Sequence, residues 1–162
     1  MKKFVFASVA LTAVAAAAFP ATAQMTEDQA RASLAPFYRA LNAVYADEAP
    51  TLIRQTTAPD WMTCRGNDLC DSREEVIAAI APRLKAIPDL QWEIKEVLVS
   101  GNRAIVRGEA TGTPAGNFMG TATNGKSFKL MSIDVHTFEG GKIVRTYHVE
   151  DWQGAFRQLS QQ

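Results

Sequence analysis

Residues 125–152 read GKSFKLMSIDVHTFEGGKIVRTYHVEDW, and this stretch predicts a long hairpin of two β-strands. Gly140 and Gly141 suit its tight turn, because glycine readily adopts the positive φ angles that such turns require. The flanking residues are rich in β-branched and aromatic types, which favour strands. Both histidines of the chain lie in this stretch, so we expect the functional site on this hairpin.

A two-residue turn would also fix the register of the hairpin. It pairs His136 with Arg145 and Asp134 with Tyr147, and cross-strand partners share a face of the sheet. One face would then carry ionisable groups over an apolar floor, namely Asp134, His136, Arg145 and Asp151 over Phe128, Leu130, Phe138, Ile143 and Val149. The opposite face would present Met131, Ile133, Val135, Val144 and Trp152, with His148 and Glu150. Since both faces are substantially apolar, we expect both to be covered.

Residues 1–23 have the pattern of a cleaved secretory signal. Lys2 and Lys3 are followed by an apolar run and by the small residues of 21–23, which suit cleavage after Ala23. A membrane anchor is the alternative, but a span needs about 20 apolar residues. We therefore expect a periplasmic or secreted protein with one domain, residues 24–162, and no stable membrane insertion after cleavage.

The charge pattern gives no indication of a nucleic-acid partner. The chain has 17 basic and 17 acidic residues and no basic stripe. Nucleic-acid binding is therefore not indicated.

Cys64 and Cys70 are the only cysteines of the chain, and turn-forming residues lie between them. A close pair in an exported protein favours a disulfide. A redox or metal pair is the alternative, but redox dithiols prefer a C-x-x-C spacing.

The order of predicted elements gives the fold class. Capping boxes at Thr26 and Ser72 open two helices, a short helix ends near Gln55, and strands follow over Gln91–Ser100 and Arg103–Gly112 before the hairpin. A short helix can end the chain. Helices followed by consecutive strands predict an α+β protein with helices gathered on one side of an antiparallel sheet. The glycine-rich residues 111–126 lack the spacing of a phosphate-binding loop and are best read as a crossover.

Several short motifs, in this order, resemble one family. They are Ser72-Arg73-Glu74, Ile87 to Trp92 (IPDLQW), Arg107 to Thr113 (RGEATGT), Gly125 to Phe128 (GKSF), Asp134-Val135-His136, Gly141 to Val144 (GKIV) and Glu150-Asp151-Trp152 with Arg157-Gln158-Leu159. From about Leu34 to Leu159 the chain resembles the SnoaL-like proteins, also labelled polyketide cyclase or ester cyclase, of the nuclear transport factor 2-like superfamily. This resemblance implies a cone-like curved antiparallel sheet that packs against three helices around a mostly apolar pocket.

The resemblance also implies a chemistry. Characterised cyclases of this type use no metal or cofactor, and an aspartate near the chain end acts as the general acid/base in an aldol closure. A histidine from the preceding strand lies beside that aspartate. By motif the two catalytic residues would be Asp151 and His136. Asp134, Tyr147, Arg145, Trp92, Tyr38 and Phe128 would then line the ligand site.

Each candidate also has a structural interpretation that stays open at this point. Asp151 precedes a predicted helix and could be its N-cap. His136 could be a core histidine paired with a carboxylate. His148 would join Asp134 and His136 only if a bulge shifted the register, so a metal site is not expected.

We therefore expect an exported, cofactor-independent cyclase, isomerase or hydrolase for a small hydrophobic carbonyl compound. The alternatives are a non-catalytic binding protein for a small hydrophobic ligand and a protein whose sheet face binds another protein. The second apolar face of the hairpin predicts a homodimer, because such a patch usually marks an interface.

Overall fold

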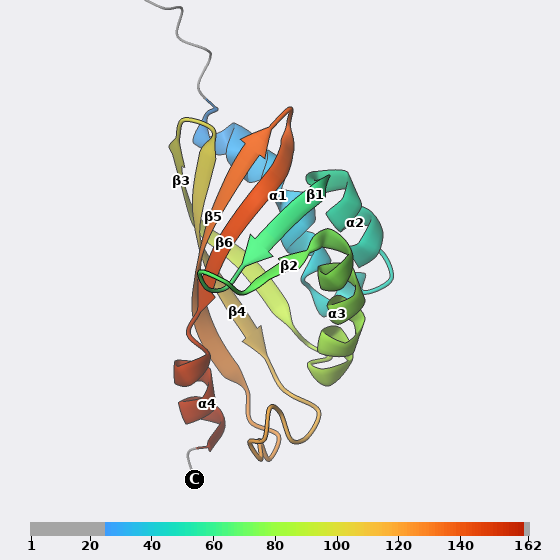
Figure 1. Cartoon of the computed structure of the whole chain (residues 1–162). Helices are drawn as coiled ribbons and strands as arrows, with labels where there is room; N and C mark the ends of the chain where they lie inside the picture. The colour runs from blue at the N-terminus through green and yellow to red at the C-terminus, as the bar shows by residue number, and fades with distance from the viewer. Residues whose placement is uncertain (1–24, 161–162) are drawn as a thin grey trace, which may run out of the picture.

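The computed structural model describes residues 25–160, in which helices precede most of the strands (Figure 1). The helices are α1 (Glu27–Ala40), η1 (Ala43–Tyr45), α2 (Ala49–Thr56), α3 (Arg73–Ala86) and α4 (Trp152–Ser160). The strands are β1 (Thr57–Cys64), β2 (Cys70–Ser72), β3 (Gln91–Ser100), β4 (Arg103–Gly112), β5 (Phe128–Glu139) and β6 (Lys142–Glu150). The predicted signal, residues 1–23, lies outside the described residues. Within residues 25–160 no helix is long and apolar enough to cross a membrane.

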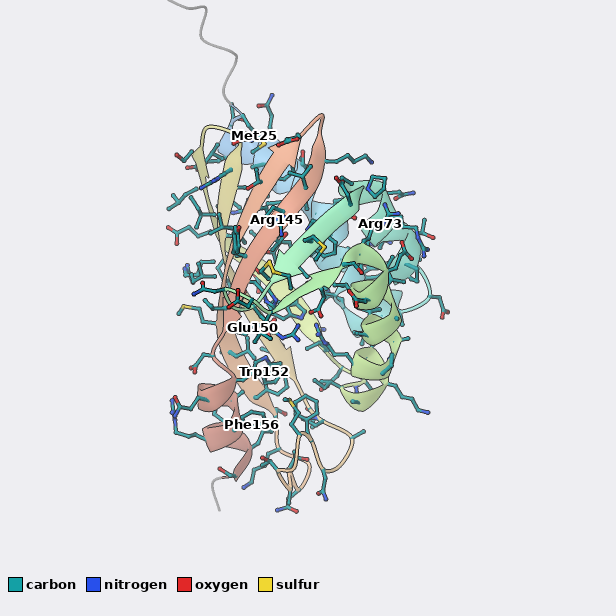
Figure 2. The ribbon with its side chains drawn as sticks, viewed as in Figure 1. Met25, Arg73, Arg145, Glu150, Trp152 and Phe156 are labelled. Carbon is teal, nitrogen blue, oxygen red and sulfur yellow. A yellow bond between two sulfur atoms is a disulfide. The ribbon has the colours of Figure 1, made fainter. Side chains whose placement is uncertain are left out.

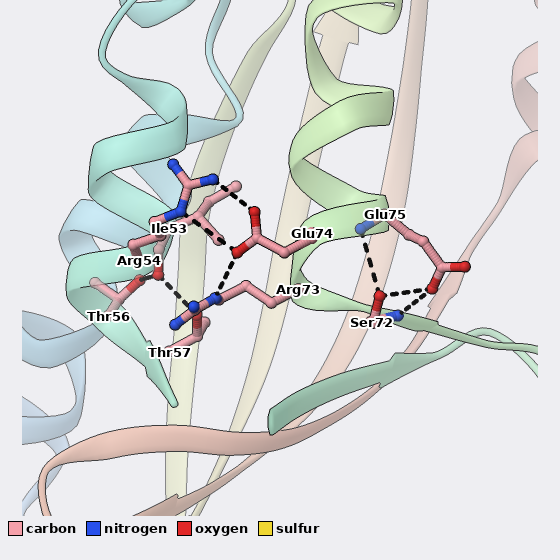
Figure 3. A network of polar contacts seen from close by, with 8 residues as sticks. All are labelled: Ile53, Arg54, Thr56, Thr57, Ser72, Arg73, Glu74 and Glu75. Atoms are coloured by element: carbon pink, nitrogen blue, oxygen red, sulfur yellow. Dashed lines mark hydrogen bonds and ion pairs between the residues drawn. The ribbon is translucent and has the colours of Figure 1, made fainter. Parts of the chain in front are cut away.

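Two capping boxes start α1 and α3 as the sequence predicts. Thr26 and Gln29 exchange side-chain to backbone hydrogen bonds at the start of α1, and Ser72 and Glu75 do so at α3. Figure 3 shows the second box beside the pair of Arg54 and Glu74, whose closest contact is 2.5 Å. This pair joins α2 to the first turn of α3.

The predicted α+β class is confirmed, and the sheet holds more strands than the sequence pattern indicates. Its six strands run in the order β2-β1-β6-β5-β4-β3. β1 pairs with β6 in parallel, so the sheet is mixed. Cys64 and Cys70 face each other across β1 and β2 and form the predicted disulfide, with an S–S distance of 2.06 Å. For this region the sequence predicts only a turn and a short extended piece over residues 59–62 and a turn at residues 66–68, not a pair of strands.

A β-bulge makes the predicted hairpin register wrong beyond the turn. Phe138 lies opposite Ile143 as predicted, but Thr137 lies opposite Arg145, which leaves Val144 as an extra residue on β6. His136 therefore pairs with Thr146, and Asp134 pairs with His148. Because side chains alternate along a strand, one extra residue exchanges the two faces of β6.

One face of the sheet packs against α1, α2 and α3; in Figure 1, α1 passes behind the strands and α2 and α3 lie to their right. The core between these layers is apolar. Its largest members include Leu34, Phe37, Ile53, Trp61, Ile80, Leu84, Val106, Phe128, Leu130 and Ile143. Burial of such side chains is the main force that holds helices and sheet together. The corrected register also places polar side chains of β5 and β6 on this face of the sheet. We call the face of the sheet that packs against these helices the inner face.

The other face of the sheet, which we call the outer face, keeps large apolar side chains in solvent. The exposed fractions are 51% for Leu98, 53% for Met131, 51% for Tyr147 and 63% for Val149. Trp152, predicted to belong to this face, instead lies beyond the end of β6 with its ring centroid 5.4 Å from that of Phe128. A contiguous apolar face of this kind usually marks an interface.

We propose that the outer face forms a two-fold homodimer. Replacing Met131 and Val149 by Lys would place charges at the centre of the interface, so we expect monomers. Light scattering during size-exclusion chromatography would measure the change. Val44→Lys is the matched control, because Val44 is 78% exposed in η1 and its side chain lies off the sheet. A monomeric unmodified protein at micromolar concentration would contradict the proposal.

Candidate functional site

A cavity of about 640 Å³ opens between the inner face, α3 and the loop after β4. This volume is in the range of small-molecule sites. Its apolar wall includes Phe37, Leu41, Trp61, Val76, Ala79, Trp92, Phe118, Met119 and Trp152. Its polar and charged wall consists of Thr63, Arg65, Asp71, Glu75, Arg83, Asp134, Thr146, His148 and Glu150. The cavity therefore combines an apolar body with ionisable groups at a few places.

Asp134 is the most buried carboxyl group of the cavity wall. Its Oδ2 accepts hydrogen bonds from the hydroxyls of Tyr38, at 2.9 Å, and Ser132, at 3.0 Å. Burial raises the pKa of Asp134 from 3.8 to about 6, although the bonds from Tyr38 and Ser132 lower it. A carboxyl with this pKa can both take and return a proton near neutral pH.

A buried chain of hydrogen bonds leads to Tyr38. Trp61 donates to Thr146 Oγ1 at 3.0 Å, and Thr146 Oγ1 lies 2.9 Å from His136 Nδ1. His136 Nε2 lies 3.2 Å from the hydroxyl of Tyr38. Since that hydroxyl gives its proton to Asp134, it can only accept from Nε2–H. Nδ1 is then the acceptor for Thr146, so every donor in the chain is used.

His136 is neutral in this arrangement. It is fully buried, and burial lowers its pKa to about 3. It does not belong to the cavity wall. Its place is therefore that of a satisfied core histidine, as in the structural interpretation from sequence, although its partners are Tyr38 and Thr146 rather than a carboxylate.

His148 and Glu150 bring a second ionisable pair into the cavity. His148 lies opposite Asp134 on the neighbouring strand, and its Nδ1 is 3.7 Å from Glu150 Oε1. Burial raises the pKa of Glu150, but His148, Trp152 and the charge of Arg83 together hold it below its usual value. Glu150 is therefore a carboxylate at neutral pH, next to an imidazole that faces the cavity.

The missing side chain of Gly108 leaves room for the Ser132 hydroxyl that donates to Asp134. A Cβ at Gly108 would lie 2.6 Å from Ser132 Oγ and 3.8 Å from the Trp92 ring. Trp92 lies against this gap and contributes to the cavity wall. Its Nε1 is buried and has no hydrogen-bond partner among the described residues.

Aromatic side chains close the far end of the cavity. Phe118 stacks near Trp152, with ring centroids 5.5 Å apart, and Trp152 lies 5.9 Å from Phe156. The Trp152 indole nitrogen donates to Glu150. Figure 2 shows Glu150, Trp152 and Phe156 in succession along the end of β6 and α4.

The structure assembles only part of the predicted ligand site. Asp134 and Trp92 line the cavity, while Tyr38 lies behind Asp134 and holds it. Phe128 is buried against Trp152 and does not belong to the wall. Arg145 and Tyr147 lie on the outer face because of the bulge at Val144, so their predicted place in the pocket is wrong.

Asp151 lies outside the cavity wall and is exposed. Its Oδ1 accepts a hydrogen bond of 2.8 Å from the backbone N–H of Gly154 in the first turn of α4. This is the helix cap that the sequence left open as the alternative. The bulge brings Glu150 into the cavity at the position next to it.

Sequence reasoning missed His148, Glu150 and Arg83 as members of the site. The bulge hides the first two, because apolar residues on both faces of β6 give no sign of a change in register. Arg83 gave no signal apart from its place near a helix end. Within residues 25–160, no group of three or more His, Cys, Asp or Glu side chains is arranged to hold a metal ion.

Comparison with known proteins supports the fold. The model of the SnoaL-like polyketide cyclase family matches residues 35–159. The chain belongs to this family. No curated protein matches the sequence.

Solved structures show the same fold at low sequence identity. A candidate SnoaL-like polyketide cyclase from Jannaschia sp. CCS1 is 19% identical with a TM-score of 0.71, and the match covers 84% of this chain and 94% of that one. IdmH, a candidate polyketide cyclase from Streptomyces antibioticus, is 21% identical with a TM-score of 0.69 over 81% and 98% of the two chains. AclR, a candidate hydroxylase from Streptomyces galilaeus, is 24% identical with a TM-score of 0.69 over 83% and 97%.

The raised pKa of Asp134 predicts that Asp134→Asn stabilises the fold at neutral pH. The native state favours the protonated carboxyl, because its pKa rises from 3.8 to about 6. The resulting stabilisation is fully present below about pH 3.8 and is lost as the pH rises through about 6. We expect Asn to raise the free energy of unfolding by about 2 kcal/mol at pH 7.5. The gain should shrink toward pH 4.5, as measured by urea denaturation.

Asp89→Asn is the matched control for this measurement. The Asp89 carboxylate accepts bonds from the backbone N–H and hydroxyl of Thr113. Burial raises the pKa of Asp89, but these bonds hold it below its usual value. This variant should lose stability at pH 7.5. A loss of similar size in Asp134→Asn would contradict the raised pKa.

Proposed function

We propose that this protein is an exported, cofactor-independent acid/base enzyme of the cyclase, isomerase or hydrolase type, with Asp134 as its general acid/base. The proposed substrate is a small hydrophobic carbonyl compound held in the cavity. One observation carries the proposal: a buried carboxyl with a pKa of about 6 lies in the wall of an apolar cavity. Family membership supports the same class of reaction.

The arrangement of Asp134 suits proton abstraction from carbon. Oδ2 is held by Tyr38 and Ser132, and no described side chain donates to Oδ1. Oδ1 takes the activated C–H proton, and the electron pair of that bond becomes the enolate. In a cyclase the enolate attacks a second carbonyl, and the carboxyl returns its proton to the new alkoxide. The overall reaction needs no added oxidant or reductant.

His148 is the proposed partner of Asp134 in this reaction. It lies opposite Asp134 on β6, and Glu150 contacts its Nδ1. This contact orients the imidazole, which would lie beside the substrate oxygen on which negative charge develops.

Export is supported by two features. Residues 1–23 have a secretory pattern. The disulfide of Cys64 and Cys70 is of a kind that persists in oxidising compartments. We therefore propose a periplasmic or secreted location.

A non-catalytic binding protein is the second candidate. The observation in its favour is the position of Asp151, which caps α4 instead of facing the cavity. Such a protein would use the same apolar wall for a hydrophobic ligand, and Asp134 would only shape its polar end. The two candidates differ in whether Asp134 exchanges protons with the ligand.

Hydrogen–deuterium exchange at carbon would test the enzyme directly. Small aryl ketones, β-diketones and lactones would be incubated with the protein in D₂O, and deuterium at the α-carbon would be followed by NMR. We expect exchange to rise with pH through about 6, where Asp134 loses its proton. Asp134→Asn should lower the rate by on the order of 100-fold.

Two further variants make this test specific. Tyr38→Phe removes a hydrogen bond that lowers the pKa of Asp134, so the pH profile should move to higher pH. Asp151→Asn should exchange like the unmodified protein, since Asp151 is exposed at the cap of α4. Binding of the compounds without any exchange would favour the binding protein. Full activity in Asp134→Asn would remove Asp134 from the mechanism.

A further inference from the structure

The charged side chains of the cavity wall are paired, with one exception. Arg65 is paired with Asp71. Glu75 Oε2 accepts from the backbone N–H and the hydroxyl of Ser72, at 2.8 Å and 2.7 Å. The other acidic groups and His148 have the partners given above, namely Tyr38 and Ser132 for Asp134 and the mutual contact of His148 and Glu150.

Arg83 is the exception. Arg83 is an exposed residue that also lines the cavity, and among residues 25–160 its guanidinium has no hydrogen-bond or ion-pair partner. A guanidinium has five N–H donors in a planar fork that fits a carboxylate or a sulfonate. Its charge still reaches the cavity, because it helps to hold the pKa of Glu150 low.

Helix geometry explains how Arg83 comes to face the ligand site. Glu75, Ala79 and Arg83 all line the cavity and follow one another at intervals of four residues along α3. Residues so spaced lie on one side of a helix. Ile80 and Leu84 are buried in the core and orient α3, so the neighbouring positions 79 and 83 lie toward the cavity.

A cation at the end of a helix can also be explained by its interaction with the helix dipole. A second cation in the same turn allows this explanation to be distinguished from ligand binding. Arg83 and Lys85 both lie in the last turn of α3, where positive charge interacts favourably with the helix dipole. Lys85 does not belong to the cavity wall. An effect through the helix should therefore appear in both residues, and an effect on a ligand only in Arg83.

We propose that Arg83 binds the anionic group of the ligand, so that the substrate class is an amphipathic organic acid. Its carboxylate or sulfonate would pair with Arg83, and its apolar body would lie against Trp61, Trp92 and Phe118. This inference rests on the proposed function only in placing the reacting carbon at Asp134. Anchoring one end of a substrate in this way limits the poses that present its C–H to the base.

The acidic groups around Arg83 set the limits of this site. Glu150 is the acidic neighbour whose pKa responds to Arg83, and it also interacts with His148 and Trp152. Glu75 lies eight positions earlier on α3, which corresponds to about 12 Å along a helix. At physiological salt this distance exceeds the screening length of about 8 Å. A single anionic group can therefore pair with Arg83, whereas a multiply charged ligand would face Glu150.

Two fluorescent compounds that differ in charge would test the inference on the purified protein. Anilinonaphthalene sulfonate is anionic, and phenylnaphthylamine is its neutral analogue. Arg83→Gln should weaken binding of the sulfonate about fivefold and leave the neutral compound unchanged. Lys85→Gln should change neither. Ala79→Trp places an indole in the same wall and so identifies the part of each signal that comes from the cavity.

Each result decides the inference. Equal effects of Arg83→Gln on both compounds, equal effects of the Arg83 and Lys85 variants, or no cavity component for the sulfonate would overturn it. Asp134→Asn should still bind the sulfonate, because this measurement needs no turnover. If the anionic site fails while Asp134→Asn still abolishes carbon exchange, only the substrate class is wrong and the proposed function stands.

Discussion

The hydrogen bond from Tyr38 to Asp134 is the interaction on which the site depends. It ends a chain of donors that begins at Trp61 on β1, crosses Thr146 on β6 and His136 on β5, and reaches α1 at Tyr38. The chain has one consistent direction only if His136 is neutral, and full burial enforces that state by lowering its pKa to about 3. Three strands and a helix are thereby held in the one arrangement that satisfies every polar group between them. An apolar core alone would position these elements less specifically.

This arrangement supports a carboxyl group that is costly to keep ionised. Burial favours the protonated form of Asp134, while two hydroxyls stabilise its charge without removing it from the cavity wall. These opposing effects leave the pKa at about 6, which is above that of an exposed carboxyl and below that of a buried carboxyl without hydrogen bonds. Stability and acid/base capacity therefore oppose each other at this position, as expected for a group that is present for chemistry rather than for folding. The exposed carboxylates that cap α3 and α4 show the contrary case, since each has a backbone partner and a local structural role.

The sequence predicts the fold better than it predicts the site, and one residue accounts for much of the difference. Capping boxes depend on local chemistry, and the predicted strands Gln91–Ser100 and Arg103–Gly112 are confirmed. The strand containing Trp61 is predicted only as a short extended piece, because its parallel partner β6 lies far along the chain and no local pattern indicates such pairing. Val144 forms a bulge in a strand whose two faces are both partly apolar, so periodicity cannot reveal the shift in register. That single shift moves Arg145 and Tyr147 out of the predicted pocket and brings His148 and Glu150 into it.

Gly108 shows how closely the cavity and the hydrogen-bond chain depend on each other. It lies opposite Ser132 in the sheet, and any Cβ there would come within 2.6 Å of the Ser132 hydroxyl. That hydroxyl donates to Asp134, so a larger residue at position 108 would displace a donor that lowers the carboxyl's pKa. The space left by the missing side chain lies against Trp92, a member of the cavity wall. The same absence therefore permits the hydrogen bond that tunes Asp134 and lets Trp92 pack against the sheet, so the packing at position 108 and the pKa of the carboxyl cannot vary independently.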